Sequence, residues 1–370
     1  MSQTRTDVYE IAGKAMTLPY GPTRLAMLEE AVRIADSLQD IDLGYQMRYN
    51  LQQSAEFSAR GDVALVSFAW RLAQYDRYPG RFDTHDIMWT YKWTIATCTR
   101  LPQVPRDRVM ALLDDFEARC RAMGHSMYAA NLLRREFLVL SGEREAARSA
   151  HAEFRKSRRD SLSDCIACVA NGNCQYYLSQ NQWRRAIQAA GPVLNGRLRC
   201  AEEPHSVLAH VLLPEVKLGQ LEEAWEHHRE GYRLVRKGRQ FVDMQGYHLR
   251  FLVLVGDLDA ARALLERHIQ DALETIMPLD RFQFLLAAAL WAERMLREGK
   301  TTAMVRMPEA APPADARGLR DIAAGRDWFL SGAREVADQF DRRNGTDAFA
   351  RRIDELPELL QPVRARRKEA

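Results

Sequence analysis

Residues that end helices recur at a nearly constant spacing in this sequence, and this recurrence limits the fold more than any other feature. Gly142, Asn181, Gly219 and Gly256 lie 39, 38 and 37 residues apart, and an alanine follows each of them five residues later. Gly and Asn close helices because they enter the left-handed backbone region at little cost. A small residue about one and a half turns later lets a second helix approach the first closely. The pattern predicts a series of helix hairpins.

The series extends in both directions from these four turns. We take Gly61, with Val66 at the fifth place, as the first turn, and we expect a turn without glycine at Leu101–Pro105. Gly299 continues the series 43 residues beyond Gly256. The turns therefore delimit about seven helix hairpins.

The segments between the turns have helical rather than strand periodicity. In residues 84–100, for example, apolar residues repeat every three to four positions. The best strand candidate, Phe251–Val255, continues a helical stripe, so we expect an all-α fold. Apolar residues make up 46% of the chain; a repeat array can bury them over 370 residues because each hairpin needs only its neighbours.

Two of the turns resemble those of a known repeat family. The stretches Leu218–Ala224 and Val255–Ala261, with sequences LGQLEEA and VGDLDAA, resemble the inter-helix turn of tetratricopeptide-type repeats. The period of 37 to 43 residues exceeds the 34 residues typical of that family, and the full tryptophan-to-proline signature is missing. The resemblance implies a right-handed superhelical solenoid of antiparallel helix hairpins, whose first helices line a concave surface that holds a peptide or protein.

The same pattern suggests four parts of the chain. Residues 1–21 form an N-terminal segment, 22–300 the solenoid, 301–318 a Pro/Ala linker, and 319–370 a C-terminal helical cap with a basic tail at Arg364–Lys368. The linker is expected because proline removes a backbone donor and disfavours helix in the residue before it. The cap is expected because the last repeat of a solenoid needs a cover for its apolar face.

Charge and hydropathy limit the partners. The 53 Lys+Arg residues nearly balance 50 Asp+Glu residues, so no strong field draws the chain to nucleic acid or to an anionic membrane. No signal-peptide core is visible, and the longest apolar run, Phe284–Ala292, is too short to span a bilayer. We expect a cytoplasmic protein without a membrane partner, for which nucleic acid is an unlikely ligand.

One group of residues has metal chemistry. Cys165 and Cys168 form a Cys-x-x-Cys pair directly after Ser163 and Asp164, which we expect to cap the first helix of a hairpin. Cys200 and His205 lie near the expected start of the first helix of the next hairpin. Stacked repeats place such helix starts side by side, so these four residues could hold one structural zinc ion. Two alternatives stay open: buried cysteines that pack like small apolar residues, and a redox dithiol.

No common enzyme motif is present, whether a phosphate-binding loop, a dinucleotide-binding loop, a nucleophile elbow or His-Glu-x-x-His. The sequence favours a non-enzymatic scaffold that binds a protein or peptide. Tyr45, Arg48, Trp89 and Lys92 are the predicted groove residues, because aromatic and cationic side chains on one face suit a peptide ligand. The tryptophans could instead belong to the core between repeats. A single-stranded RNA-binding repeat protein and an enzyme with an unrecognised site are the alternatives.

Overall fold

The computed structural model describes residues 3–361 and is mostly helical. The all-α prediction is confirmed at this level. The chain divides into two compact units, the first comprising residues up to Leu133 together with Lys156–Ser163, and the second comprising Arg134–Arg155 together with the chain from Asp164 onward. Each unit is described by itself.

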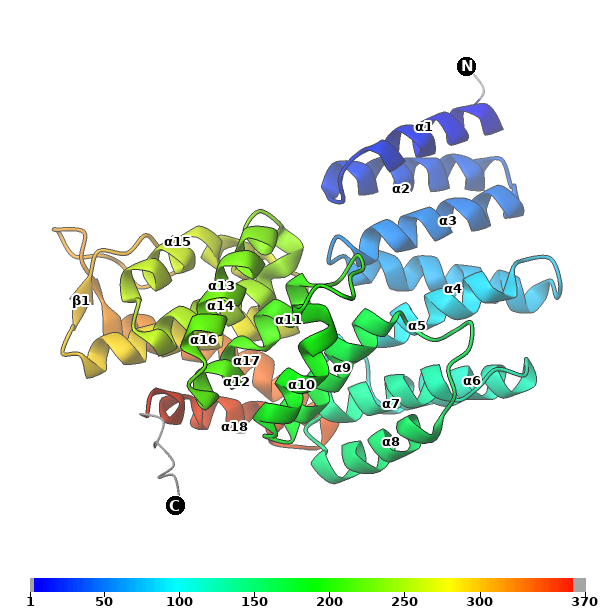
Figure 1. Cartoon of the computed structure of the whole chain (residues 1–370). Coiled ribbons are helices and arrows are strands. Elements are labelled where there is room, and N and C mark those ends of the chain that lie inside the picture. The colour runs from blue at the N-terminus through cyan, green and yellow to red at the C-terminus, as the bar shows by residue number, and fades with distance from the viewer. Residues whose placement is uncertain (1–2, 362–370) are drawn as a thin grey trace. The chain divides into compact units, whose positions relative to one another are not determined.

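The first unit is a series of antiparallel helices that follow one another in chain order (Figure 1). Aspartates begin several of them, because their carboxylates accept a hydrogen bond from a backbone N–H in the first turn: Asp40 accepts from Leu43 and Asp83 from Asp86. The helices are α1 (Arg5–Thr17), α2 (Pro22–Ser37), α3 (Ile41–Glu56), α4 (Gly61–Arg77), α5 (Thr84–Arg100), α6 (Arg106–Ala122) and the start of α7 (Tyr128–Leu140).

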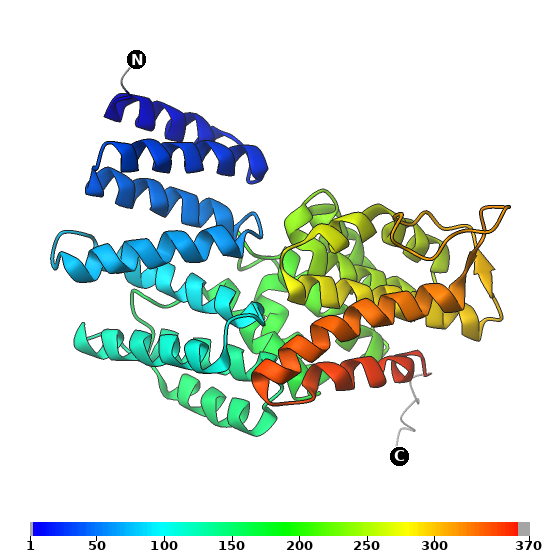
Figure 2. The same ribbon diagram turned by 180° about the vertical axis from the view of Figure 1, so that it is seen from behind.

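The second unit continues the hairpin pattern. Its helices after α7 are α8 (Arg144–Lys156), α9 (Ile166–Ser179), α10 (Trp183–Leu194), α11 (His205–His210), α12 (Leu212–Leu218), α13 (Leu221–Val235), α14 (Val242–Val255), α15 (Leu258–Glu274), α16 (Pro278–Arg297), α17 (Ile322–Asn344) and α18 (Ala348–Asp354), with short 3-10 turns η1 (Arg239–Phe241) and η2 (Leu356–Leu360). The apolar run Phe284–Ala292 lies in α16 and is buried between α14 and α17. Figure 2 shows α17 lying along α16 from behind.

The turns predicted from the repeat spacing have the expected backbone. Gly142, Asn181, Gly219, Gly256 and Gly299 have φ values of 78°, 58°, 77°, 85° and 76°. Gly219 and Gly256 are the left-handed caps that end α12 and α14. The spacing therefore located these helix ends correctly.

The first predicted turn was placed two residues too late. Gly61 is not left-handed; it is the first residue of α4, and the left-handed residue is Ala59, with φ 53°. Five residues after Ala59 comes Ala64, which is fully buried, whereas Val66 is 72% exposed. The rule of a small residue at the fifth place thus holds here as well. The turn residue is an alanine, however, and alanine does not mark a turn in a sequence.

The segment predicted as a linker contains one strand of the only β-structure in the described residues, and the other strand follows it directly. Strand β1 (Thr302–Ala303) pairs antiparallel with β2 (Arg320–Asp321), and Val305 and Ala311 from the loop between them are buried. The predicted basic tail, residues 364–368, lies outside the described residues. Within the described part of the chain, no helix combines the length and apolarity needed to cross a membrane.

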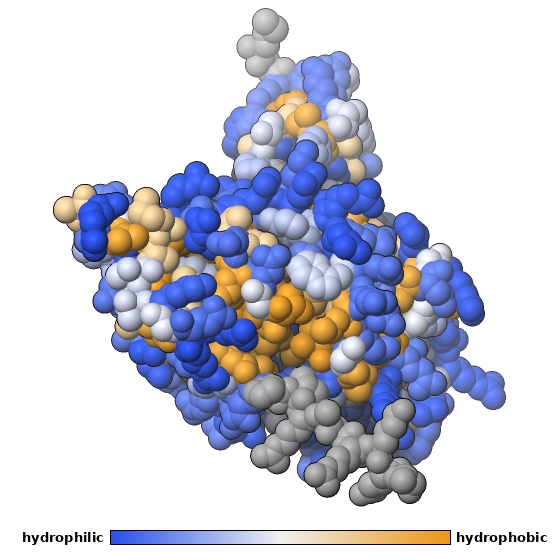
Figure 3. All heavy atoms as spheres, turned by 60° about the vertical axis from the view of Figure 1, so that its left-hand side comes forward, coloured by the Kyte–Doolittle hydropathy of each residue, from blue (hydrophilic) through white to orange (hydrophobic). Residues whose placement is uncertain are grey.

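The surface is mostly hydrophilic when seen from the end that carries β1. Apolar side chains reach the surface near the middle of this view (Figure 3). In the described residues of the second unit, the large exposed apolar residues are Ile166, Leu221, Leu234, Ile276 and Met304.

Candidate metal centre

Two of the predicted metal ligands lie at the start of α9. Cys165 is itself the residue that caps this helix, and its Sγ accepts a hydrogen bond from the backbone N–H of Cys168 at 3.3 Å. The sequence-based prediction gave the cap to Ser163 and Asp164, one to two residues too early. Because the first turn of a helix has free N–H groups, this position favours a sulfur that carries negative charge.

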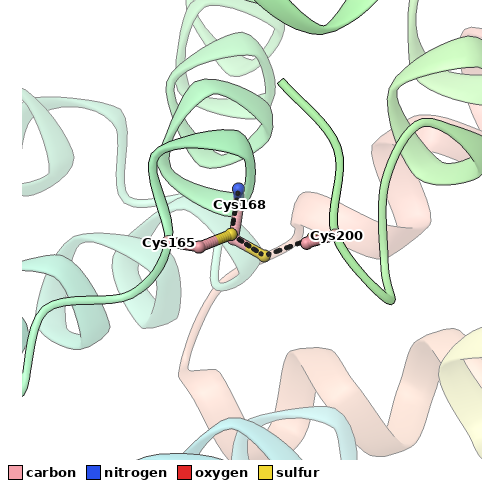
Figure 4. A group of neighbouring side chains, drawn as sticks. All are labelled: Cys165, Cys168 and Cys200. Atoms are coloured by element: carbon pink, nitrogen blue, oxygen red, sulfur yellow. Dashed lines mark hydrogen bonds between the residues drawn. The ribbon is translucent and has the colours of Figure 1, made fainter. Parts of the chain in front are cut away.

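The third sulfur comes from the connection between α10 and α11. Cys168 Sγ lies 3.3 Å from Cys165 Sγ and 3.5 Å from Cys200 Sγ, and all three sulfurs lie within 4.8 Å of one another. Figure 4 shows the three side chains pointing toward one another, two from the helix start and one from the facing loop. The convergence predicted from stacked repeats is therefore present for the cysteines.

The spacing of the sulfurs fits a tetrahedral metal ion. Four ligands at about 2.3 Å from zinc place neighbouring sulfurs about 3.8 Å apart, close to the two distances above. A disulfide would need a separation of about 2.0 Å, and all three cysteines are free. Cys165 is exposed and the other two are half-buried, so an ion could reach the group from solvent.

Without a cation these sulfurs favour the thiol form. Burial, together with the neighbouring Cys165 and Cys200 sulfurs, raises the pKa of Cys168 well above that of an ordinary thiol. Burial also raises the pKa of Cys200. A bound dication reverses this balance, since thiolates ligate metals and coordination removes their protons.

His205, the predicted fourth ligand, is not part of this group. It is the first residue of α11, and its ring packs edge-to-face on Phe241, with the centroids 5.0 Å apart. Burial lowers the pKa of His205, and the charge of Asp243 partly opposes this. The ring thus faces the residues that lead into α14, whereas Cys200 lies in the loop before α11 and faces α9.

The predicted groove residues do not form one exposed stripe. Tyr45 is 6% exposed and stacks on Phe82 with the ring centroids 3.9 Å apart. Lys92 is 2% exposed; its Nζ donates to the carbonyl of Leu162 at 2.6 Å and lies 3.5 Å from the ring centroid of Trp89. Both side chains therefore contribute to the interior of the first unit.

The other two predicted groove residues keep more contact with solvent, but they are engaged within the protein. Arg48 donates two hydrogen bonds to the carboxylate of Asp36, at 2.9 and 2.8 Å, and its guanidinium lies 4.0 Å from the ring centroid of Trp70. Trp89 is half-buried beside Lys92. We therefore do not propose a partner site on this stripe.

Charge reversal at Lys92 should reduce the stability of the protein more than charge reversal at Arg48. Lys92→Glu should destabilise the first unit by about 3 kcal/mol or more, because it leaves a buried carboxylate facing a carbonyl oxygen. Arg48→Glu should cost about 1 kcal/mol, since its ion pair is partly exposed. Urea unfolding of both variants checks this, and equal stabilities would contradict the described burial of Lys92.

The sequence analysis missed a row of polar side chains in the second unit, here called the polar row: Asn171, His210, Tyr247 and Arg250. His210 Nδ1 lies 2.9 Å from Asn171 Oδ1, the His210 and Tyr247 rings meet edge-to-face at 5.2 Å, and the Arg250 guanidinium lies 4.9 Å from the Tyr247 ring centroid. The first three are 39 and 37 residues apart, the same period as the turns. A search for polar residues repeated at that period would have found them.

No protein-family model matches the chain, and no curated protein matches it.

Proposed function

We propose that the protein is a non-enzymatic binding protein of the cytoplasm, built as a right-handed superhelix of helix hairpins, and that Cys165, Cys168 and Cys200 hold one structural zinc ion in its second unit. The observation that carries the zinc site is the convergence of three sulfurs within 4.8 Å from two separate segments. Thiolates are the ligands that structural zinc sites use most, and zinc brings no redox chemistry of its own.

In this proposal the ion ties the start of α9 to the loop that precedes α11. The three cysteines would supply three ligands, and His205 faces Phe241 rather than the sulfurs. The tie joins residues that are 32 positions apart, and because these ligands come together only in the folded chain, metal binding stabilises the folded state.

Metal analysis tests the site directly. Protein purified without chelator should contain about one zinc per chain, and cobalt substitution should give the charge-transfer absorption of thiolate ligands. The Cys168→Ser/Cys200→Ser variant should lose the metal. Chelation should lower the melting temperature by about 5 °C or more, since a ligand that binds only the folded state stabilises it.

His205→Ala provides the matched control. It should keep its metal, because His205 contacts Phe241 rather than the sulfurs. Loss of zinc in this variant would restore His205 as the fourth ligand. Zinc below a tenth of an equivalent, with the thiols titrating normally, would contradict the site. Formation of a Cys165–Cys168 disulfide in a glutathione buffer would instead support the redox alternative.

A further inference from the structure

The three sulfurs of the candidate metal centre differ in how easily solvent reaches them. Cys165 is exposed, whereas Cys168 and Cys200 are half-buried. The other three cysteines of the chain are 4% exposed or less: Cys98, Cys120 and Cys174. Oxidation of cysteine follows the exposure and the thiolate character of the sulfur. An oxidant in solution therefore meets Cys165 first.

Cys165 and Cys168 are placed for a disulfide as well as for an ion. Cys165 caps α9 and Cys168 lies in its first turn, with 3.3 Å between the two sulfurs. A disulfide bond needs the sulfurs to approach each other by about 1.3 Å more, which side-chain rotation can supply. Dithiol–disulfide couples often use a Cys-x-x-Cys pair at a helix start, because the free N–H groups there stabilise a thiolate.

A disulfide between Cys165 and Cys168 would remove the tie to Cys200. Cys200 lies in the loop before α11, residues 195–204, and its Sγ is 3.5 Å from Cys168 Sγ. The disulfide takes two of the three thiolates from the ion, and a single thiolate holds zinc weakly. Loss of the ion thus separates this loop from the start of α9.

We propose that this centre releases its ion when a hydroperoxide oxidises Cys165 and Cys168 to a disulfide. The loop 195–204 is then tied to α9 in the reduced, zinc-loaded protein and loses this tie in the oxidised protein. The proposal rests on the zinc site proposed above and adds its regulation. A hydroperoxide suits the centre because it is small and needs to reach only the exposed sulfur.

The oxidation takes two steps. In the first, the Cys165 thiolate attacks the hydroperoxide; an S–O bond forms, the O–O bond breaks, and the departing alkoxide or hydroxide takes a proton from water. In the second, the Cys168 thiolate attacks the oxidised Cys165 sulfur; an S–S bond forms, the S–O bond breaks, and hydroxide leaves and takes a second proton. The peroxide receives two electrons, one from each sulfur, and the dication, left with Cys200 alone, passes to solvent.

Hydrogen peroxide added to the zinc-loaded full chain tests the release. A chromogenic zinc chelator should detect about one zinc set free per chain, together with the loss of two thiols and about 2 Da of mass. Dithiothreitol followed by zinc should reverse all three changes. Without metal, Cys165→Ser should lose its remaining thiols at least tenfold more slowly than the wild type. Cys174→Ser is the matched control, since Cys174 is buried on the same helix, and it should change the rate less than twofold.

Limited proteolysis measures the effect on the loop. Arg197 and Arg199 are exposed in the loop, and trypsin cleaves after arginine. Cleavage at these two residues should be at least fivefold faster after oxidation, because a segment that loses a tie opens more often. Cleavage at Arg81, which is exposed in the loop between α4 and α5, should stay unchanged.

Four results would overturn the proposal. Zinc that stays bound while peroxide is present would overturn the release and leave the zinc site standing. A disulfide that joins Cys200 to either partner would overturn the assignment of the oxidised pair. Release of zinc with unchanged cleavage at Arg197 and Arg199 would overturn the effect on the loop. Protein that binds no zinc overturns the zinc site and its regulation together, and this result is seen before any peroxide is added.

Discussion

Replacing Gly246 by alanine is expected to destabilise the second unit by about 3 kcal/mol, which corresponds to a fall in melting temperature of about 6 to 12 °C. A Cβ at this position of α14 would lie 2.9 Å from Phe284 Cα, 3.0 Å from Phe284 N and 3.1 Å from the carbonyl carbon of Gln283. These are backbone atoms of α16, so no side chain can turn aside to make room. The gain in helix propensity, about 1 kcal/mol, is too small to offset the clash.

Gly325→Ala is the control for that substitution. Gly325 lies inside α17, and a Cβ there would meet no atom within 4 Å, so the alanine should stabilise the protein by about 0.5 to 1 kcal/mol. Thermal and urea unfolding of both variants measure the difference. If Gly246→Ala proved as stable as Gly325→Ala, α14 and α16 could not be in the close contact described above.

Acid is expected to destabilise the second unit strongly between about pH 6.5 and pH 4. Burial lowers the pKa of His151, His228 and His268 to about 4, and that of His248 further. His228 Nδ1 lies 3.1 Å from His248 Nδ1, and the Tyr232 hydroxyl lies 3.0 Å from His268 Nε2, so neutral rings suit these contacts. Below pH 6.5 the unfolded chain binds protons at these histidines that the folded state does not bind. Their contribution to the free energy of unfolding is therefore fully present above pH 6.5 and is lost as the pH falls.

Other buried groups oppose part of this loss. Burial raises the pKa of Glu203 to about 8, so this carboxyl favours the folded state more as the pH falls from 8 toward 4.5. Each group contributes at most about 1.4 kcal/mol per pH unit, so four histidines less one glutamate give a limiting slope of roughly 4 kcal/mol per unit.

Urea unfolding at pH 7.5, 6 and 5 measures this slope. His228→Gln/His248→Gln should flatten it by about two-thirds, because glutamine keeps hydrogen-bonding groups but does not titrate. His227→Gln should not flatten it, since Glu215 raises the pKa of His227 against the effect of burial and its contribution has the opposite sign. A slope that is unchanged in the double variant would show that these histidines are not buried in the folded state.

The sequence predicted those features that depend on local backbone chemistry. Gly142, Gly219 and Gly256 marked helix ends because few other residues take the left-handed conformation easily, and the structure has them there. Ala59 could not be found in this way, since alanine carries no conformational signal. The cysteines could be grouped because repeat geometry relates the segments that carry them.

Burial of polar side chains could not be predicted. In the sequence, Lys92 and Arg48 are both cations that share a helix face with aromatic residues. In the structure, Lys92 is buried against a carbonyl, whereas Arg48 is paired with Asp36 near the surface. Whether a polar residue lines a groove or lies inside depends on the neighbouring helix, which the residue's own spacing does not reveal. His205 illustrates the same limit, because a ring at a helix start can turn toward either adjacent repeat.

Residues near the C-terminal end of the second unit contact residues near its beginning. The Thr346 hydroxyl donates to the carbonyl of Ser141 at 3.0 Å, and a Cβ at Gly142 would lie 2.2 Å from the Cβ of Ala348. These partners are separated by 205 residues in the chain. At about 5 to 20 residues per second, the ribosome needs roughly 10 to 40 s to supply the second partner after the first. During synthesis the turn at Gly142 therefore lacks its partner segment for this time and stays accessible to chaperones. The neighbouring hairpins have the residues they need to fold long before.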